Sequence, residues 1–448
     1  MSTEEEPHPN DRRTIEVKAI SRVEGEGRLH LRVQGDVVEH VELNIYEPPR
    51  FFESFLRGRQ VHEVPDITAR ICGICPVAYQ MSSCHALEKA LGISISPEIR
   101  LLRRLLYCGE WIESHVLHMF LLHAPDFLGY ESGISMAVDH KEQVERGLEL
   151  KKIGNQLLET LGGRAIHPVN VTVGGFYRAP SVRELKLLLP RLEWGLKTAL
   201  ETVEWVSKFD FPDFDLDYDL VSLHHEEEYP LNEGQVASSS GLKIPVEEYE
   251  TYFYERHIEH STALYSVKGP DDRFYLTGPL ARLNNCIEML SPICRKAFDQ
   301  TGLILPLRNN FQSIVARSLE VAYAFDEAIR IVKAYQAEVS PSRTPFQLRP
   351  GEGCHATEAP RGLLYHRYRI GEDHLIAEAK IVPPTSQNQG QIETDLREFL
   401  PRIVDLKDAE IAQRSEHLIR NYDPCISCAT HFLQLSIDRK TDSQPHIG

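Results

Sequence analysis

"ARICGICPVAYQ" (residues 69–80) and "YDPCISCATHF" (residues 422–432) each contain a Cys-x-x-Cys pair, and most of the chain lies between them. Four thiolates from two such pairs can bind a tetrahedral zinc ion, although the gap between the pairs of a zinc site is usually far shorter. A thioredoxin-like redox site needs only one pair, in a βαβ context that this sequence lacks. The spacing alone leaves a structural zinc site and unrelated core cysteines open.

The composition is that of a globular protein with an acidic surface. The 448 residues are 42% hydrophobic and 26% charged, with a formal net charge of -17. Binding to a nucleic-acid backbone requires a cationic face, so nucleic acid is excluded as a partner. No apolar run is long enough for a membrane span, and the acidic start "MSTEEEPHPNDRR" has no signal core. These features predict a cytoplasmic location. The nine cysteines are an odd number, which argues against a disulfide framework, so we expect reduced thiols.

Hydrophobic periodicity predicts a mostly helical body with small antiparallel sheets near both ends, a mainly α (α+β) fold. Alternating apolar residues predict strands within 14–46, turning at 34–36, and a hairpin within 365–382. Helical spacing of apolar residues predicts long helices, over 97–123, 141–163, 310–336 and 408–421. Ser181 and Glu184 form a capping box that opens a further helix, which Pro190 should kink or break.

The chain is expected to form one compact unit with a tail at each end. No internal repeat and no linker composition divides it. We expect residues 1–12 to be disordered, residues 13–431 to form a single domain, and residues 432–448 to form a C-terminal extension.

The residues around both cysteine pairs resemble the signatures of one family, the large subunit of nickel–iron hydrogenases. Its first signature, Arg-x-Cys-Gly-x-Cys, matches residues 70–75, and its last, Asp-Pro-Cys-x-x-Cys-x-x-His, matches residues 423–431. Other stretches resemble the family in the same order: "RVEGEGR" (22–28), "FFESFLRGR" (51–59), "SHVLHMF" (114–120), "HPVNVTVGG" (167–175), "EAPRGLLYH" (358–366) and "VPPTSQN" (382–388). The resemblance implies the family's fold, in which both pairs meet around one buried bimetallic centre.

The resemblance assigns four cysteines to a nickel–iron centre. Splitting H₂ into a hydride and a proton needs a metal that accepts hydride and a base that accepts the proton, and soft thiolates suit nickel and low-spin iron. By resemblance, Cys72 and Cys425 are terminal nickel ligands. Cys75 and Cys428 would bridge nickel to an iron that carries cyanide and carbon monoxide. Cys425 is the thiolate expected to take the proton.

Four further residues match catalytic or cofactor-binding positions of the family. Glu24 matches the carboxylate that relays the proton away, whereas outside such a motif a loop Glu is usually a surface residue. Arg361 matches an Arg over the open metal face, where its fixed donors can orient cyanide or polarise substrate. Asp423 is expected to pair with Arg361 and to form the turn before the second pair. Thr385 is expected to contact the cofactor.

A separate hard-metal site is implied near the C-terminus. Glu53 and His431 match two ligands of a magnesium or iron(II) ion, completed by the backbone carbonyl of Lys380 and by water. In the family a maturation protease cuts directly after this His once nickel is loaded. The resemblance therefore implies that residues 432–448 are removed.

Some positions stay open or depart from the family pattern. His115 and His118 lie three residues apart on one predicted helix and are either groups behind the metal ligands or satisfied core histidines. Tyr79 stands where many members have His, Ser114 where many have Asp, and Pro384 where some have Ser. None of these changes removes a metal ligand. The other five cysteines are expected to be ordinary buried thiols.

The motif variants are similar to those of the cytoplasmic bidirectional branch linked to NADP, whose members can also reduce sulfur. Deazaflavin-linked and heterodisulfide-linked hydrogenases are the alternatives, together with a non-catalytic relative of the complex I type, which would lack the paired cysteines. The chain has no ferredoxin-like cysteine cluster and no Gly-x-Gly-x-x-Gly loop. Electrons must leave through partners, so the resemblance implies an iron–sulfur small subunit together with flavin/NAD(P)-binding and ferredoxin-like subunits.

Overall fold

A computed structural model describes residues 12–35, 37–336 and 339–430 of the chain. Helices outweigh strands, and the sheets are small, which confirms the predicted mainly α fold class. The N-terminal residues 1–11, predicted to be disordered, lie outside the described residues. His431 and the predicted extension at 432–448 also lie outside them.

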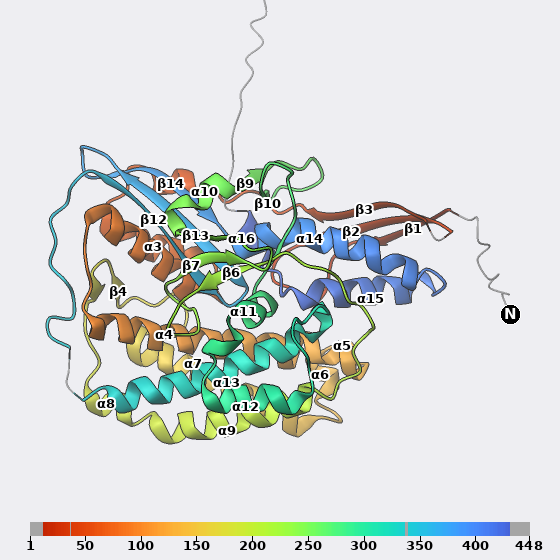
Figure 1. Cartoon of the computed structure of the whole chain (residues 1–448), viewed down its shortest axis with the longest axis horizontal. Coiled ribbons are helices and arrows are strands. Elements are labelled where there is room, and N and C mark those ends of the chain that lie inside the picture. The colour runs from red at the N-terminus through yellow and green to blue at the C-terminus, as the bar shows by residue number, and fades with distance from the viewer. Residues whose placement is uncertain (1–11, 36, 337–338, 431–448) are drawn as a thin grey trace, which may run out of the picture.

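The N-terminal sheet is an antiparallel meander of β1 (Arg12–Val17), β2 (Gly27–Gln34) and β3 (Val37–Ile45). Every second residue of β2 is buried, and the residues between them are exposed or partly exposed. The sheet therefore has one apolar face, and it packs against α14 (Pro384–Phe399) and α15 (Asp408–Asn421) (Figure 1). The sequence predicted these strands and the bounds of α15 correctly.

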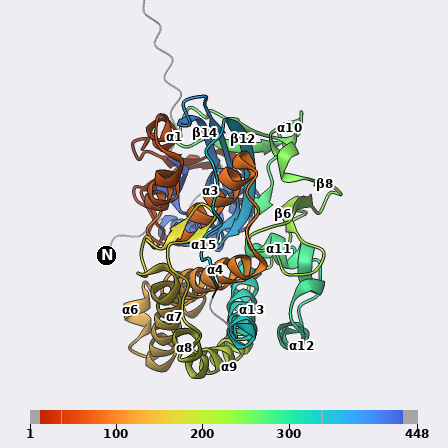
Figure 2. The ribbon, with the colours of Figure 1, turned by 90° about the vertical axis from the view of Figure 1, so that its left-hand side faces the viewer.

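Four long helices form a layer across the molecule: α4 (Pro97–Leu117), α7 (Lys141–Gly162), α9 (Leu189–Val206) and α13 (Ser313–Ala334). α4 and α9 each pack against both α7 and α13, so every helix buries its apolar stripe against two neighbours. Figure 2 shows these helices in the lower half of the molecule, with the larger strands above them.

A second antiparallel sheet consists of β12 (Gly351–Ala359), β13 (Gly362–Ile370) and β14 (Ile376–Val382). β13 and β14 form the hairpin predicted within 365–382. Helix α3 (Pro76–Leu91) lies between this sheet and α4, and nearly all of its residues are buried. The start of α3, directly after the first cysteine pair, is therefore held deep in the molecule.

Two predicted helices differ in detail from the structure. The capping box of Ser181 and Glu184 opens α8 (Val182–Lys186), which ends after five residues. A second helix, α9, then begins at Leu189, with Pro190 in its first turn. The helix predicted over 97–123 ends as an α-helix at Leu117, and His118–His123 continue it as a π-helix. Apolar spacing does not distinguish these two helical forms over so few residues.

The middle of the chain holds a four-stranded sheet that the sequence did not predict. It consists of β6 (Leu220–His224), β7 (Gln235–Ser238), β8 (Lys243–Ile244) and β11 (Leu276–Thr277). Strands this short carry too few residues to show alternation. β11 pairs with β6 in parallel, whereas the predicted sheets near both ends of the chain are antiparallel.

The other strands and helices are short and connect these layers: α1 (Phe52–Leu56), α2 (Val64–Thr68), α5 (Ala124–Leu128), α6 (Gly133–Met136), β4 (Val171–Thr172), β5 (Gly175–Phe176), α10 (Tyr249–Tyr252), β9 (Phe253–Arg256), β10 (Tyr265–Lys268), α11 (Pro279–Cys286), α12 (Pro292–Thr301) and α16 (Ile426–Ala429). One hydrophobic cluster includes buried residues from Ile15 to Cys428 and joins both ends of the chain. Within the described ranges, no helix has both the length and the apolarity that crossing a bilayer requires.

Candidate metal centre

The first cysteine pair lies in the turn that leads into α3. Pro76 follows Cys75 as the first helical residue, where proline is favoured because its missing N–H would have no partner. Both thiols are buried, and the Cys72 Sγ accepts the backbone N–H groups of Ile74 (3.4 Å) and Cys75 (3.2 Å). Burial opposes ionisation, but hydrogen bonding from Cys75 and the charge of Arg361 outweigh it and lower the pKa of Cys72. This cysteine is therefore poised to act as a thiolate ligand.

The second cysteine pair lies between α15 and α16. Asp423 adopts a left-handed backbone conformation (φ 52°), which ends the helix and turns the chain towards Cys425. The Cys425 N–H donates to the Thr385 hydroxyl oxygen at 3.0 Å. The N–H of Ile426 donates to the backbone carbonyl of Glu24 at 2.9 Å. These two bonds dock the cysteine loop against α14 on one side and against the N-terminal segment on the other.

The fold brings the two pairs together, as the sequence led us to expect. All four cysteines are buried, and their sulfur atoms lie within 4.8 Å of one another. The sulfur atoms of Cys72 and Cys425 are 3.6 Å apart, and Cys425 and Cys428 are joined as a disulfide. Metal ligation requires thiolates, so this disulfide must be reduced before a metal binds. A donor set of four buried sulfur atoms fits a soft metal such as nickel.

Glu24 lies directly against the second pair. Its Oε2 is 3.0 Å from the Cys425 Sγ and accepts the N–H of Ser427 at 3.1 Å. Gly25 allows this close approach, because its φ is +86° and a Cβ atom there would lie 2.8 Å from the Ser427 nitrogen. A carboxylate within hydrogen-bond distance of a thiol can exchange a proton with it.

Arg361 and Asp423 form a buried pair beside the sulfur atoms. The Arg361 Nε donates to the backbone carbonyl of Asp423 at 2.8 Å, and its Nη2 lies 3.2 Å from the Asp423 Oδ1. Burial disfavours the guanidinium charge, but Asp423 and the nearby thiols raise the pKa of Arg361, which therefore stays cationic. Among the described residues, the Arg361 Nη1 and the Asp423 Oδ2 have no hydrogen-bond partner. Each can therefore contact a group bound at the centre.

Arg50 ties the two cysteine loops together, and the sequence reasoning missed it. Its guanidinium donates to the backbone carbonyl of Ile71 at 2.7 Å and to that of Ser427. These carbonyls come directly before Cys72 and Cys428. Nothing in "EPPRF" distinguishes this Arg from a surface residue, because both acceptors are backbone atoms distant in sequence.

Glu110 holds the start of α3 and was also missed. It lies on α4, is fully buried, and accepts the N–H groups of Val77 (2.5 Å) and Ala78 (2.9 Å). The first N–H groups of a helix have no partner within it, so Glu110 satisfies two of them. A Glu inside the apolar run "LLYCGEWI" was the available signal, because a buried carboxylate needs a buried partner.

The residues expected at the hard-metal site are only partly described. Glu53 accepts the N–H of Ile381 at 2.7 Å, which places it beside Lys380 on β14. Glu53 and Lys380 line the same surface hollow of about 560 Å³. The Thr430 carbonyl accepts the N–H of Arg50 at 2.6 Å, so the last described residue lies near α1. His431 itself lies outside the described residues.

The two histidines near the end of α4 have different surroundings. The His115 Nε2 is 2.9 Å from the Glu320 Oε2 in a fully buried cluster, which favours the core alternative. The His118 Nε2 is 2.8 Å from the Arg420 carbonyl oxygen and 3.9 Å from the Asp423 Oδ1. His118 therefore lies directly behind the candidate site.

Two of the three departures from the family pattern place hydroxyl groups in the interior. The Tyr79 and Ser114 hydroxyls are buried and have no partner within the part of the chain that the structure describes. Burial and the nearby thiols of Cys75 and Cys72 raise the pKa of Tyr79, so its phenol stays neutral. Pro384 is the first residue of α14 and supplies no side-chain donor.

The other five cysteines are buried in the core: Cys84, Cys108, Cys286, Cys294 and Cys354. Burial raises the pKa of Cys84 and Cys294 to about 12, so both are protonated at neutral pH. They are ordinary buried thiols, as expected.

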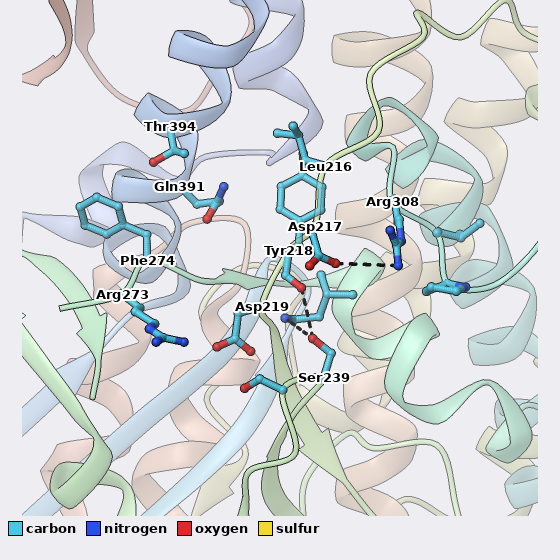
Figure 3. Close-up of a pocket in the computed structure, with 14 residues that line it drawn as sticks. Leu216, Asp217, Tyr218, Asp219, Ser239, Arg273, Phe274, Arg308, Gln391 and Thr394 are labelled. Atoms are coloured by element: carbon cyan, nitrogen blue, oxygen red, sulfur yellow. Dashed lines mark hydrogen bonds and ion pairs between the residues drawn. The ribbon is translucent and has the colours of Figure 1, made fainter. Parts of the chain in front are cut away.

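The most clearly formed surface hollow among the described residues does not mark this centre. Figure 3 shows this hollow of about 670 Å³, surrounded by Asp217, Arg308 and Phe274 among others. It contains none of the predicted site residues. The cysteine cluster is recognised from its converging sulfur atoms, because it is buried beneath the surface.

Residues 50–146 and 237–431 match the family described as nickel-dependent hydrogenase, and the matched segments contain all four clustered cysteines. The protein belongs to the nickel-dependent hydrogenase family. The resemblance inferred from the two signatures is thereby confirmed, and the structural zinc site is set aside.

Similar hydrogenases extend over nearly the whole chain. The alpha chain of sulfhydrogenase 1 from Pyrococcus furiosus is 32% identical, over 94% of this chain and 98% of the relative. An F420-non-reducing hydrogenase of Methanococcus voltae is 28% identical, over 93% of this chain and 94% of the relative. An NAD⁺-reducing [NiFe]-hydrogenase in its H₂-reduced state has a TM-score of 0.85 at 26% identity, covering 94% of this chain and 99% of that one. This hydrogenase chain is a catalytic subunit, so the non-catalytic alternative is wrong.

Proposed function

We propose that this hydrogenase subunit cleaves H₂ reversibly and heterolytically in the cytoplasm. The 3.0 Å contact between the Cys425 sulfur and the Glu24 Oε2, beside four clustered sulfur atoms, carries the proposal. Heterolysis yields products of opposite charge, so it needs a soft metal site next to a proton acceptor. The contact supplies that pairing.

The four clustered cysteines would hold the metals. Nickel would be bound by all of them, with Cys72 and Cys425 as terminal ligands and with Cys75 and Cys428 shared with an iron that carries carbon monoxide and cyanide. When bound, this metal pair supplies a soft acceptor for the electrons of H₂. The lowered pKa of Cys72 favours the thiolate that such ligation needs.

Arg361, Asp423 and Thr385 would orient groups at the centre. Asp423 fixes the guanidinium of Arg361 and leaves its Nη1 without a partner among the described residues, so this donor can face substrate or cyanide. The Thr385 hydroxyl oxygen accepts the Cys425 N–H, which leaves the hydroxyl hydrogen for an anionic ligand.

A proton released at the centre would leave through Glu24 and Glu47. The Cys425 sulfur lies 3.0 Å from the Glu24 Oε2, so the reduced thiol could donate its proton directly to this carboxylate. Ser427 holds the two carboxylates near each other, because its N–H donates to Glu24 (3.1 Å) and its hydroxyl donates to the Glu47 Oε1 (3.0 Å). A backbone N–H does not release a proton, so the proton would pass from Glu24 to Glu47 through water. Glu47 is partly exposed, so it can pass the proton to solvent.

Glu47→Gln is expected to slow turnover by about tenfold, less than the loss of a group that touches the reacting atoms. The effect is limited because water can reach this partly exposed position and replace part of the carboxylate's role. Turnover measured in H₂O and in D₂O tests the step, and the variant should show the larger solvent isotope effect. Parental rates in both solvents would exclude Glu47 from the route.

A magnesium or iron(II) ion held by Glu53, the Lys380 carbonyl and His431 would fix the C-terminus beside the centre. The proximity of Glu53 to Lys380 supports two of these ligands. A maturation protease would cut after His431 and remove residues 432–448, because a charged tail attached to a buried ligand is costly unless it is paired.

Electrons would leave through an iron–sulfur small subunit to flavin/NAD(P)-binding and ferredoxin-like subunits. The likeness to an NAD⁺-reducing [NiFe]-hydrogenase supports a nicotinamide acceptor, and the likeness to a sulfhydrogenase supports sulfur reduction. The likeness to an F420-non-reducing hydrogenase keeps a heterodisulfide-linked or deazaflavin-linked complex as the alternative.

Metal analysis of the purified complex tests the proposal. Nickel is expected together with an excess of iron, because the iron–sulfur partners also contain iron, and the complex should reduce NADP⁺ or NAD⁺ under H₂. Zinc at this site, or a metal-free complex that still consumes H₂, would refute the ligand assignment. Reduction of a deazaflavin or a heterodisulfide in place of NAD(P)⁺ would favour the alternative branch.

A further inference from the structure

One continuous helical element contacts both cysteine loops. α4 (Pro97–Leu117) continues without a break as the π-helix His118–His123 and then as α5 (Figure 1). Side chains from this one element bond to the chain just after the first cysteine pair and just before the second. The two pairs are far apart in sequence, so their relative position depends on contacts such as these.

The contact with the first pair is made by Glu110. Its two carboxylate oxygens accept the N–H groups of Val77 and Ala78, the second and third residues after Cys75. Glu110 is fully buried, and no water competes for these bonds. The carboxylate therefore fixes where α3 begins, and with it the position of Cys75.

The contact with the second pair is made by His118 and His123. The His118 Nε2 is 2.8 Å from the Arg420 carbonyl oxygen, and the His123 Nε2 is 2.9 Å from the Asn421 Oδ1. Both histidines are fully buried, and burial lowers the pKa of each well below its usual range. A neutral imidazole has a single N–H, and each ring donates it to a residue of the segment that leads to Cys425.

The π-helical turn is what brings these two side chains together. At 3.6 residues per turn, side chains five positions apart on an α-helix point about 140° away from each other. A π-helix bonds residue i to residue i+5 and so places the two nearly above one another. The ring centroids of His118 and His123 are accordingly 5.0 Å apart. An α-helix of the same sequence could not present both rings to Arg420 and Asn421.

The loop that these histidines hold is under backbone strain. Asp423 has a φ of 52°, a conformation that costs a non-glycine residue energy and persists only when its surroundings fix it. Ser313 donates to the Asn421 carbonyl at 2.9 Å, and Arg361 donates to the Asp423 carbonyl at 2.8 Å. The Tyr422 hydroxyl donates to the buried Asp395 Oδ2 at 2.6 Å. With the two histidines, every residue from Arg420 to Asp423 is therefore bonded by a buried side chain.

We propose that α4 and its π-helical turn set the spacing and orientation of the two cysteine pairs, with Glu110, His118 and His123 as positioning residues. The inference rests on the proposed role of the four cysteines as metal ligands. It assigns the π-helical turn a function, because straightening it would release the second loop while leaving the first in place.

Leucine and glutamine substitutions at His118 and His123 test this inference in the full complex. Leucine removes the N–H donor, whereas glutamine retains an N–H that can reach the same acceptor. His355→Leu is the matched control, because His355 is also buried and its Nε2 is 2.6 Å from the Asn232 carbonyl oxygen, which belongs to neither of the two paired-cysteine loops.

Three readouts separate positioning from general stability: nickel content, the electron paramagnetic resonance spectrum of the nickel, and amide exchange over residues 419–428. The leucine variants should lose about 10- to 100-fold in activity or nickel occupancy, which is the usual effect of mutating a residue that supports a metal ligand. Their nickel spectrum should change and their loop amides should exchange faster, and the glutamine variants should restore most of both. His355→Leu should lower thermal stability without moving the spectrum.

Further variants keep the test decisive where a leucine variant does not fold. Asn421→Ala removes the partner of His123 from the loop side and should reproduce its effects. Glu110→Leu should speed amide exchange over residues 76–80 and leave residues 419–428 protected. An unchanged spectrum and unchanged loop exchange, with only isotope exchange of H₂ slowed, would make the histidines a proton relay and overturn the inference. A parental complex without nickel would refute the proposed function instead, since amide exchange tests the loop contacts independently.

Discussion

Replacing Cys425 with serine is expected to abolish H₂ turnover and to deplete the complex of nickel. A serine oxygen is a harder donor than sulfur and is protonated at neutral pH, so it is a poor ligand for this site. The serine hydroxyl could still donate to Glu24, but it is far less acidic than a thiol and would not exchange a proton with this carboxylate as readily. Mutating a residue that supports a metal ligand lowers metal affinity or activity by up to about 100-fold. Loss of a ligand itself should therefore lower turnover by at least about this factor. H₂-dependent dye reduction and nickel content of the same preparation measure it.

Cys294→Ser is the matched control for this substitution. Cys294 is a fully buried cysteine on α12, outside the sulfur cluster. Its substitution also replaces a sulfur atom by an oxygen atom. It should lower thermal stability and leave nickel and specific activity at parental levels. Near-parental activity with full nickel in the Cys425→Ser complex would remove Cys425 from the ligand set.

The parts of this structure that the sequence could predict depend on local patterns. The helix at 408–421 was predicted with its observed bounds because its apolar spacing is regular and a turn residue follows it. The convergence of the two cysteine pairs was inferred from signatures carried by a few adjacent residues each. Periodicity alone would not have brought Cys72 and Cys425 to within 3.6 Å.

The parts that could not be predicted depend on contacts between residues far apart in sequence. Arg50 and Glu110 bond to backbone groups of the cysteine loops. Nearly every residue has the same backbone groups, so the sequence does not indicate which of them will be bonded. The π-helical turn differs from an α-helix by hydrogen bonds that span five residues instead of four, and apolar spacing does not reveal this over so short a segment. The sequence left His118 open between a group behind the metal ligands and a core histidine, and it gave no signal for His123, whose ring lies 5.0 Å from that of His118.

Glu24→Gln is expected to leave the metals bound and to slow turnover by about 10²- to 10⁴-fold, the range typical of a lost acid–base group. The amide oxygen can still accept the N–H of Ser427, so the loop should keep its position. The amide cannot carry a proton away from the Cys425 thiol. Isotope exchange between H₂ and D₂O, measured beside metal content, reports this step directly.

Two further variants decide whether Glu24 transfers the proton or only supports the loop. Glu26→Gln changes an exposed carboxylate two residues away and should exchange isotopes at the parental rate. Glu24→Asp keeps the carboxylate on a shorter side chain, so it should retain more activity than Glu24→Gln if proton transfer is the role. If Glu24→Gln instead loses nickel together with activity, the bond between its side chain and the Ser427 N–H matters more than its acidity, and the result does not assign the proton route to Glu24. Exchange at the parental rate with full metal would show that Glu24 is not on the route, although it lies 3.0 Å from the sulfur.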